Sequence, residues 1–482
     1  MRRIAGVAAL LLAGCTTVGP DYEQPQVAVP GNYLEAGRGE AVSDATLARW
    51  WTQLNDPLLD RLVGQALAQN LDVQSAAARI REARAQERVA GAGALPRVDA
   101  EGSVTRQRIS ENAIPVPPGS GAPGGGGGFG LPGTEFTTFR AGFDASWEID
   151  LFGGTRRGVE AARARTGAAI WDRRDAEVST AAEVARTYLA LRTIQQRIAN
   201  AEAELARAQR LERIVGARVR GGLVSGLDLE QQQSERAAAA AQIPALRADE
   251  RGQIHALGAL VGSTPDALAA ELSAPAALPP TPPLIPAGLP SDLLRRRPDV
   301  REAERRLAAS TADIGVAVAD LYPRFTLTAA PALVSTALTS LLDWGSRSFS
   351  LGAGLVWPLL DGGRSRANIA VANARQEQAL IAYRKEVLVA LQDVEDSLSR
   401  NAGDRQRLVQ LEEAHRSASA AERLADTRYR GGLTDFAQVL AARQRRLTTE
   451  EQMIETRGAL ARDVVALYKA LGGGWDASGA TP

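Results

Sequence analysis

The chain is made of two related halves, and this internal repeat limits the folds open to it more than any other feature. Arg220-Gly221-Gly222-Leu223 recurs as Arg430-Gly431-Gly432-Leu433, and Trp147 recurs as Trp357, at an offset of 210 residues. Residues 71–97 match residues 298–324 at an offset of 227. Repeats of this length indicate one structural plan used twice, so each expected element has a counterpart in the other half.

The repeat divides the chain into six parts. We expect a signal peptide at 1–14, a lipidated N-terminal segment at 15–57, a first copy at 58–272, a proline-rich linker at 273–290, a second copy at 291–473 and a tail at 474–482. The first copy carries about 17 extra residues, in the stretch that contains Gly124 to Gly128. No Gly-Lys-Ser/Thr follows these glycines, so they predict a loop and not a phosphate-binding site.

The first residues form an export signal. Met1-Arg2-Arg3 is basic, residues 4–12 are apolar and small, and Leu12-Ala13-Gly14-Cys15 follows. About nine apolar residues are too few to cross roughly 30 Å of hydrocarbon, so we expect a cleaved signal peptide. The ending resembles a bacterial lipobox, which implies cleavage before Cys15 and acylation of that cysteine, palmitate included. A plain signal peptide with a nearby cysteine is the alternative. Thr16, where an aspartate often marks retention in the inner membrane, favours sorting to the outer membrane.

Four segments alternate between apolar and polar residues. Residues 137–149 place Phe139, Phe143 and Trp147 on one side, and residues 347–357 repeat the pattern. Residues 97–106 and 323–330 alternate over shorter stretches. A period of two over about ten residues is typical of a transmembrane β-strand, although a half-buried soluble sheet has the same period. Four such strands on a lipidated chain favour a membrane barrel.

Four strands cannot close a barrel alone. Known membrane barrels start at eight strands, and an open strand edge in lipid would leave its N–H and C=O groups unsatisfied. Three copies of the chain would supply twelve strands, so the pattern predicts a homotrimer.

The remaining segments predict unusually long helices. Residues 133–243 and 359–481 contain no proline, and residues 158–220 are rich in Ala, Arg, Glu and Gln. Some sixty helical residues span roughly 90 Å. We expect partner helices at 226–262 and 433–471, with a kink at Pro244 in the first. Solvated coiled-coil hairpins without a channel are the alternative.

The composition excludes several classes of function. The chain has 56 basic and 56 acidic residues, so it lacks the positive excess of a nucleic-acid binder. Two histidines, His255 and His415, and one cysteine nearly exclude zinc sites, disulfides and Cys–His catalysis. No Ser-His-Asp set is recognisable either, so we expect neither an enzyme nor a cofactor or metal site.

Together these features resemble the outer membrane factor family, the TolC/OprM-like channels, and specifically its lipoprotein (NodT-type) branch. The resemblance covers nearly the whole mature chain. It rests on Cys15-Thr16-Thr17-Val18-Gly19-Pro20-Asp21-Tyr22, Trp50-Trp51, Asp56-Pro57-Leu58, Arg296-Arg297-Pro298-Asp299-Val300, Tyr322-Pro323, Trp357-Pro358-Leu359-Leu360-Asp361-Gly362-Gly363 and the two Arg-Gly-Gly-Leu turns.

The resemblance implies a mixed α/β membrane channel: a trimeric, twelve-stranded antiparallel β-barrel with four strands per chain, continued by a long α-helical coiled-coil barrel. It implies a lipid-anchored protein in the outer membrane of a Gram-negative bacterium, extending into the periplasm. The implied function is a passive exit duct for small molecules in a tripartite efflux pump. Its implied partners are outer-membrane lipid, a periplasmic membrane-fusion adaptor and an inner-membrane transporter of the RND type.

The resemblance also assigns site residues. The two turns are implied to contact the adaptor through Gly221, Gly222, Leu223, Val224, Ser225, Gly431, Gly432, Leu433 and Thr434. Asp228 and Tyr429 fall on a polar link that holds family channels closed. A link-forming arginine of the family aligns with Thr434, and carboxylates that narrow the pore align with Gln438 and Ala441, so this sequence departs from the acidic pattern. Asp435 is the candidate replacement in the gate, with a helix N-cap as its alternative role.

Other roles stay open. Trp147 and Trp357 fit either an interfacial aromatic belt or packing at a helix–strand junction. A type I protein-secretion duct would keep the fold and change the cargo. A lipoprotein scaffold of coiled coils without a pore would be a different class of protein, and high salt or loss of Cys15 would release it from the membrane.

Overall fold

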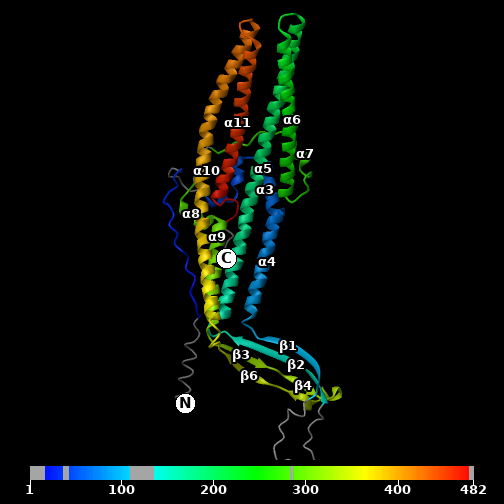
Figure 1. Ribbon diagram of the computed structural model, residues 1–482, viewed down its shortest axis with the longest axis vertical. Helices are drawn as coiled ribbons and strands as arrows, with labels where there is room; N and C mark the ends of the chain where they lie inside the picture. Colours follow the sequence, from blue (N-terminus) through cyan, green and yellow to red (C-terminus); the bar gives the residue numbers. More distant parts are fainter. Residues whose placement is uncertain (1–16, 36–42, 109–134, 283–284, 286, 477–482) are drawn as a thin grey trace, which may run out of the picture. The chain divides into compact units, whose positions relative to one another are not determined.

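The computed structural model describes residues 17–35, 43–108, 135–282, 285 and 287–476. They belong to two compact units (Figure 1). Unit 1 draws on residues 1–23, 83–165 and 307–379, and unit 2 on residues 24–82, 166–306 and 380–482. The predicted signal peptide, Cys15 and the glycine run at 124–128 lie outside the described residues.

One antiparallel sheet forms the centre of unit 1. Its strands are β1 (Arg97–Arg108), β2 (Glu135–Ile149), β3 (Arg324–Ala329), β4 (Ala332–Ser335), β5 (Arg347–Ser348) and β6 (Leu351–Val356). β1 pairs with one side of β2, while β3 and β4 pair with the other side. β6 lies beyond β3 and β5 beyond β4. Among the described strands, β1 at one edge and β5 and β6 at the other each have an unpaired side.

The second copy matches one strand expectation and departs from the other. The strand expected at 323–330 is β3, and an additional short strand, β4, follows Pro331. The strand expected at 347–357 becomes β5 and β6. Proline has no N–H for the ladder, and the Pro331 carbonyl accepts a hydrogen bond from the Phe143 N–H at 2.9 Å. β3 and β4 share one strand position, as do β5 and β6, so the sheet keeps four strand positions.

The pairing register gives the sheet one apolar and one polar face. Residues directly opposite each other point to the same side, as do Ala100 with Phe143 and Phe325 with Leu355. The apolar face comprises Val98, Ala100, Val104, Phe139, Ala141, Phe143, Ala145, Trp147, Phe325, Leu327, Leu333, Leu351 and Leu355. The opposite face carries Asp99, Glu101, Ser103, Arg140, Asp144, Thr326 and Thr328. Val104 and Leu351 are 68% and 76% exposed, so much of the apolar face is uncovered within one chain.

The helices of the two copies have equal lengths. α5 (Gly154–Arg220) and α10 (Arg364–Arg430) each have 67 residues, and α6 (Gly226–Leu260) and α11 (Phe436–Ala470) each have 35. α4 (Leu71–Ala92) and α9 (Pro298–Ala319) each have 22. The shorter helices are α2 (Asp44–Ala48), α3 (Pro57–Gln69), α7 (Ala269–Leu272) and α8 (Pro290–Arg296), with 3₁₀ turns η1 (Trp50–Leu54), η3 (Leu338–Ser340) and η4 (Trp344–Ser346).

α6 runs from Gly226 to Leu260 with Pro244 inside it, and the predicted kink at this proline stays a prediction. The start of α11 differs from expectation. α11 begins at Phe436 and not at residue 433, because Asp435 adopts an extended conformation and caps the helix. In the described part of the chain, no helix combines the length and the apolar character needed to cross a membrane.

The core of unit 2 joins the segment after the N-terminus to the long helices. The Trp50 ring stacks on Tyr468 at a centroid distance of 5.3 Å. Asp56 caps α3 by accepting N–H bonds from Leu58 and Leu59, and its second oxygen accepts the Tyr188 hydroxyl proton at 2.6 Å. Burial raises the pKa of Tyr188 to about 12. Tyr188 is thus a buried structural residue.

Candidate functional site

The hairpin of α5 and α6 reverses through a Schellman motif. The Leu223 N–H donates to the Arg218 carbonyl and the Gly222 N–H to the Val219 carbonyl, both at 2.9 Å. Gly222 has φ +70°, the left-handed conformation that this motif requires. The Gly-Gly pair therefore ends the helix, and the Arg218 and Val219 carbonyls near its end keep hydrogen-bond partners.

The hairpin of α10 and α11 reverses in the same way. The Leu433 N–H donates to the Arg428 carbonyl at 2.9 Å and the Gly432 N–H to the Tyr429 carbonyl at 3.0 Å. Gly432 also has φ +70°. We refer to residues 220–225 and 430–435 as the tip turns.

Each tip turn leads directly into a capped helix. The Ser225 hydroxyl accepts the Asp228 N–H at 3.4 Å, and the Ser225 hydroxyl lies 3.2 Å from the Asp228 carboxylate. The Asp435 carboxylate accepts the Gln438 N–H at 3.0 Å. Asp435 thus has the N-cap role within one chain, and an exposed carboxylate oxygen at a helix start is also favoured by the helix dipole.

The tip turns offer a small, partly apolar surface. Leu223 and Leu433 are 75% and 72% exposed. Val224 and Thr434 are half-buried, whereas the other predicted adaptor-contacting residues are exposed: Gly221, Gly222, Ser225, Gly431 and Gly432. Because glycines precede each leucine, no neighbouring side chain there keeps Leu223 or Leu433 from inserting into an apolar partner surface.

A small hydrophobic cluster joins the two hairpins next to the tip turns. Its buried members are Val215 on α5 and Phe436 and Val439 on α11. Half-buried residues surround it: Leu211, Val219, Val224, Leu229, Ala425, Tyr429 and Leu440. The position of one tip turn is therefore coupled to that of the other by packing.

The predicted link between Asp228 and Tyr429 does not form within the described chain. The Asp228 carboxylate lies beside Ser225, and the buried Tyr429 hydroxyl oxygen has no hydrogen-bond partner among the described residues. The Tyr429 ring contacts Phe436 at 5.2 Å, and the Arg218 guanidinium lies 5.5 Å from its centroid. Burial, together with the Asp228 charge, raises the pKa of Tyr429, so the phenol stays neutral and can donate a hydrogen bond.

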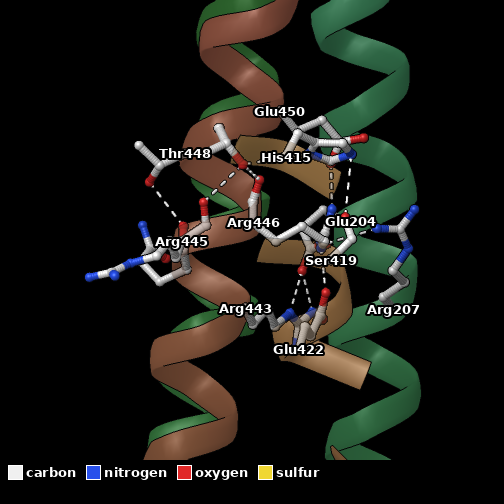
Figure 2. Close-up of polar contacts among 12 residues, drawn as sticks. Glu204, Arg207, His415, Ser419, Glu422, Arg443, Arg445, Arg446, Thr448 and Glu450 are labelled. Carbon is white, nitrogen blue, oxygen red and sulfur yellow. Dashed lines mark hydrogen bonds and ion pairs between the residues drawn. The ribbon is translucent and has the colours of Figure 1, made fainter. Parts of the chain in front are cut away.

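A buried ionic cluster connects the same two hairpins (Figure 2). The Glu204 carboxylate on α5 accepts the Arg443 Nε–H at 2.7 Å and an Arg446 Nη–H at 2.9 Å, both from α11. Arg446 also pairs with Glu422 of α10 at 2.5 Å and with Glu450. The Glu204, Arg443 and Arg446 side chains are only 7–8% exposed.

Charge balance explains how this cluster is tolerated. Burial lowers the pKa of Arg446, but Glu422, Glu204 and Glu450 outweigh that effect and raise it above its ordinary value. Each buried cation therefore has a carboxylate partner, as burial requires. Sequence reasoning missed this cluster. The spacing of Arg443, Arg446 and Glu450 puts them on one helix face, but nothing local identifies Glu204 as their partner.

In unit 1, the segment after the predicted lipidation site is docked on the start of α5. The Arg157 side chain, 4% exposed, donates to the Val18 carbonyl at 3.1 Å and the Gly19 carbonyl at 3.3 Å. It also pairs with Asp21 at 2.7 Å and Glu160 at 2.8 Å. Gly19 lies so close to helix α9 that an added Cβ would be 2.4 Å from the Gly315 Cα. These contacts give the Val18-Gly19-Pro20-Asp21 stretch a structural role. They hold the chain in place from Val18 onward, two residues after Thr16.

The two equivalent tryptophans mark the same position in each copy. The Trp147 indole N–H donates to the Ala94 carbonyl and the Trp357 indole N–H to the Leu321 carbonyl, both at 3.0 Å. Ala94 and Leu321 follow α4 and α9, just before β1 and β3 begin. The rings are 37% and 53% exposed. They thus bond to the helix–strand junction and still present apolar surface outward, so both roles considered from the sequence are compatible with the geometry.

Within the described ranges, no group of three or more His, Cys, Asp or Glu side chains is arranged to hold a metal ion. The two ring nitrogens of His415 lie 3.5 Å from the Ser419 and Thr449 hydroxyl oxygens, beside the ionic cluster.

Comparison with known proteins agrees with this architecture. A model of the outer membrane efflux protein family matches residues 62–263 and 289–473. The chain is 33% identical to the pyoverdine export outer membrane protein OpmQ of Pseudomonas aeruginosa, over 98% of this chain and 97% of that protein. It is 31% identical to nodulation protein T of Rhizobium leguminosarum bv. viciae, over 99% and 94% of the two chains. The structure of the outer-membrane channel OprN superposes with a TM-score of 0.86 at 33% identity, covering 96% of this chain and 100% of OprN. The chain therefore belongs to the outer membrane efflux protein family and is the outer-membrane component of an efflux pump.

Proposed function

We propose that three copies of this chain close one twelve-stranded barrel and form a passive exit duct for small molecules. The supporting observation is the sheet of unit 1. Its two edges are unpaired among the described strands, and four strand positions are half of the smallest known membrane barrel. Pairing β1 of one copy with β5 and β6 of the next satisfies both edges and leaves no unpaired strand edge in the lipid.

The dimensions of the apolar face suit a membrane. On β2, Trp147 and Thr137 are ten residues apart. Thr137 pairs with Arg106, the position on β1 at which charged side chains replace apolar ones. At roughly 3.4 Å per residue and a tilt of 35–45°, ten residues cross about 24–28 Å. Outer-membrane barrels carry an apolar band about 25 Å tall. The polar face, with Glu101, Arg140 and Asp144, then lines the duct.

The tip turns are the proposed docking site for a periplasmic membrane-fusion adaptor, which would connect the duct to an inner-membrane transporter, of the RND type by family resemblance. Leu223 and Leu433 provide exposed apolar contacts, and the Schellman turns hold them rigidly. Rigid anchors lose little conformational entropy on binding. Substituting both leucines with serine should weaken adaptor binding while leaving trimer assembly unchanged.

The same helix ends carry the proposed gate, formed by Asp228, Tyr429, Asp435 and Gln438. Tyr429 keeps an unused hydroxyl that can donate to a carboxylate when the hairpins shift. Asp435 in three copies would place three negative charges around the axis. Divalent-cation block of conductance that disappears in Asp435→Asn supports this ring, and unchanged block contradicts it. Asn is a good N-cap residue, so this variant separates charge from capping.

Lipidation of Cys15 is the proposed second attachment to the membrane. Arg157 restrains residues 18–21, so an acyl chain on Cys15 would enter the membrane next to the junction of β2 and α5. This would anchor the periplasmic side of the barrel, at the level of Trp147.

The deciding experiment measures the mass of the detergent-extracted protein and its conductance in planar bilayers. A mass of three chains with ion conductance supports the duct. A monomer that dissolves without detergent after removal of the lipid would instead support a scaffold lipoprotein. Transport of an unfolded polypeptide in place of small molecules would identify a type I secretion duct. No catalysed reaction is expected in any of these assays.

A further inference from the structure

Arg347 differs from every other arginine in the described strands. Five of the six pair with a carboxylate: Arg97 with Asp99, Arg106 and Arg108 with Glu135, Arg140 with Asp144, and Arg324 with Asp320. Arg347 has no acidic partner among the described residues. Its guanidinium lies 4.0 Å from the centroid of the Trp344 ring, which is 80% exposed.

The register places Arg347 on the apolar face of the sheet. Arg347 pairs with Leu333, Leu333 pairs with Ala141, and Ala141 belongs to the apolar row of β2. An arginine on the lipid side of a membrane strand destabilises a barrel by up to about 2–4 kcal/mol at mid-depth and by little near the interface. An unpaired cation on this face therefore favours an anion at the membrane surface.

Its distance from Trp357 places Arg347 near the far rim of the apolar band. Ten residues separate them, the same number as from Trp147 to Thr137 in the first copy. At the usual strand rise and tilt, this again crosses about 24–28 Å. Arg347 is also the first residue of β5, directly after a turn that exposes Leu338, Leu342 and Trp344. A tryptophan beside apolar residues at a strand end is typical of the membrane interface.

A mostly apolar hollow of about 730 Å³ on the sheet is lined by Arg347, Glu101 and Ser348 and by small and apolar residues. The small and apolar residues include Ala100, Gly102, Ala141, Phe143, Leu333 and Phe349. The pairing register places the Glu101 side chain on the opposite face of the sheet from Ala100 and Gly102, so Arg347 is the charged side chain on the apolar face here. A cation at the mouth of an apolar groove has the chemistry to bind an amphiphile with an anionic head and an acyl chain. Guanidinium groups bind phosphate through two parallel hydrogen bonds, and the Trp344 ring would hold the guanidinium in place.

We propose that Arg347, Trp344 and this hollow form a binding site for a phosphate-bearing lipid of the outer leaflet. The phosphate contacts the Arg347 guanidinium and one acyl chain occupies the hollow over Gly102. This inference rests on the proposed function, because it requires the apolar face to be in contact with lipid.

Native mass spectrometry of the full-length protein in detergent tests the proposal, with lipid A as the probe. Arg347→Gln should weaken lipid A binding by roughly tenfold, the effect of losing one charge-assisted contact. Arg140→Gln removes the same charge from the polar face and should leave binding unchanged. Gly102→Leu fills the hollow without changing charge, and its site has open space for a side chain. It should also weaken binding, which keeps the test valid if Arg347→Gln folds poorly.

Three probes identify the source of the phosphate. Stronger binding of lipid A than of phosphatidylglycerol supports an outer-leaflet glycolipid, and equal binding supports the phosphate site with phospholipid as its ligand. Lipid A stripped of phosphate should bind like the Arg347→Gln variant does. Unchanged lipid A binding by Arg347→Gln and Gly102→Leu would overturn the proposal. Conductance measured on the same samples distinguishes failure of the lipid site from failure of the duct. If the wild type conducts ions but the variants bind lipid A unchanged, only the lipid site is refuted. A non-conducting monomer refutes the duct.

Discussion

Removing the Glu204 carboxylate should destabilise the helical unit far more than removing any exposed acidic residue nearby. Arg443 forms its ion pairs with Glu204, so Glu204→Ala leaves a buried guanidinium without compensation. Arg446 keeps Glu422 and Glu450 and is less affected. Breaking a buried pair by removing one partner costs about 3–5 kcal/mol. We therefore expect the free energy of unfolding to fall by about that amount.

Glu202→Ala is the matched control. Glu202 lies on the same helix and pairs with Arg247 at 2.6 Å, but the two side chains are 47% and 55% exposed. An exposed pair contributes about 0–1 kcal/mol, so this variant should be close to wild type. Urea unfolding followed by far-UV circular dichroism, at one protein concentration in one detergent, measures both variants.

A double variant separates the pair from the individual residues. Glu204→Leu combined with Arg443→Leu removes both charges and fills the space with apolar side chains. Such replacements are often neutral or stabilising, so the double variant should be much more stable than Glu204→Ala. Equal unfolding free energies for Glu204→Ala and Glu202→Ala would refute the reasoning. Such a result would mean that Arg443 is buried without its carboxylate partner at no measurable cost in stability.

Three further variants test other parts of the structure. Gly222→Ala forces a side chain into the left-handed region and should lower the unfolding free energy by about 1–2 kcal/mol, whereas Gly226→Ala, inside α6, should be neutral or stabilising in the same urea assay. Arg157→Gln should make the N-terminal segment several-fold more sensitive to proteinase K; Arg156→Gln, whose partner is Asp150, should not, and equal cleavage would contradict the docking. Burial and the Asp404 charge raise the pKa of Asp463 to about 6, so the folded state binds that proton more tightly than the unfolded state. Stability should therefore decline as pH rises from about 4 to about 6, and Asp463→Asn should flatten this decline in thermal unfolding at several pH values.

Local patterns in the sequence were enough to predict most of the architecture. Strand alternation is a local property, and it correctly predicted the apolar row of β2 and the apolar side of β1. The Gly-Gly pairs correctly predicted both reversals, because only a residue that accepts φ +70° can end a helix in that way. The strand expected at 323–330 agrees with β3, whereas β4 after Pro331 and the division of 347–357 into β5 and β6 were not predicted from the alternation alone.

The partners of buried charges were not predictable, because they come together only when the chain folds. Glu204 and Arg443 are 239 residues apart in sequence, and Arg157 and Asp21 are 136 apart. Each of these residues alone looks like one of many charges on a helix surface. The sequence by itself determined the elements, their order and their repeated plan, since these depend on residues close together in the chain. Only the tertiary structure decided which charges are buried and how they are compensated, since that depends on which helix faces pack against each other.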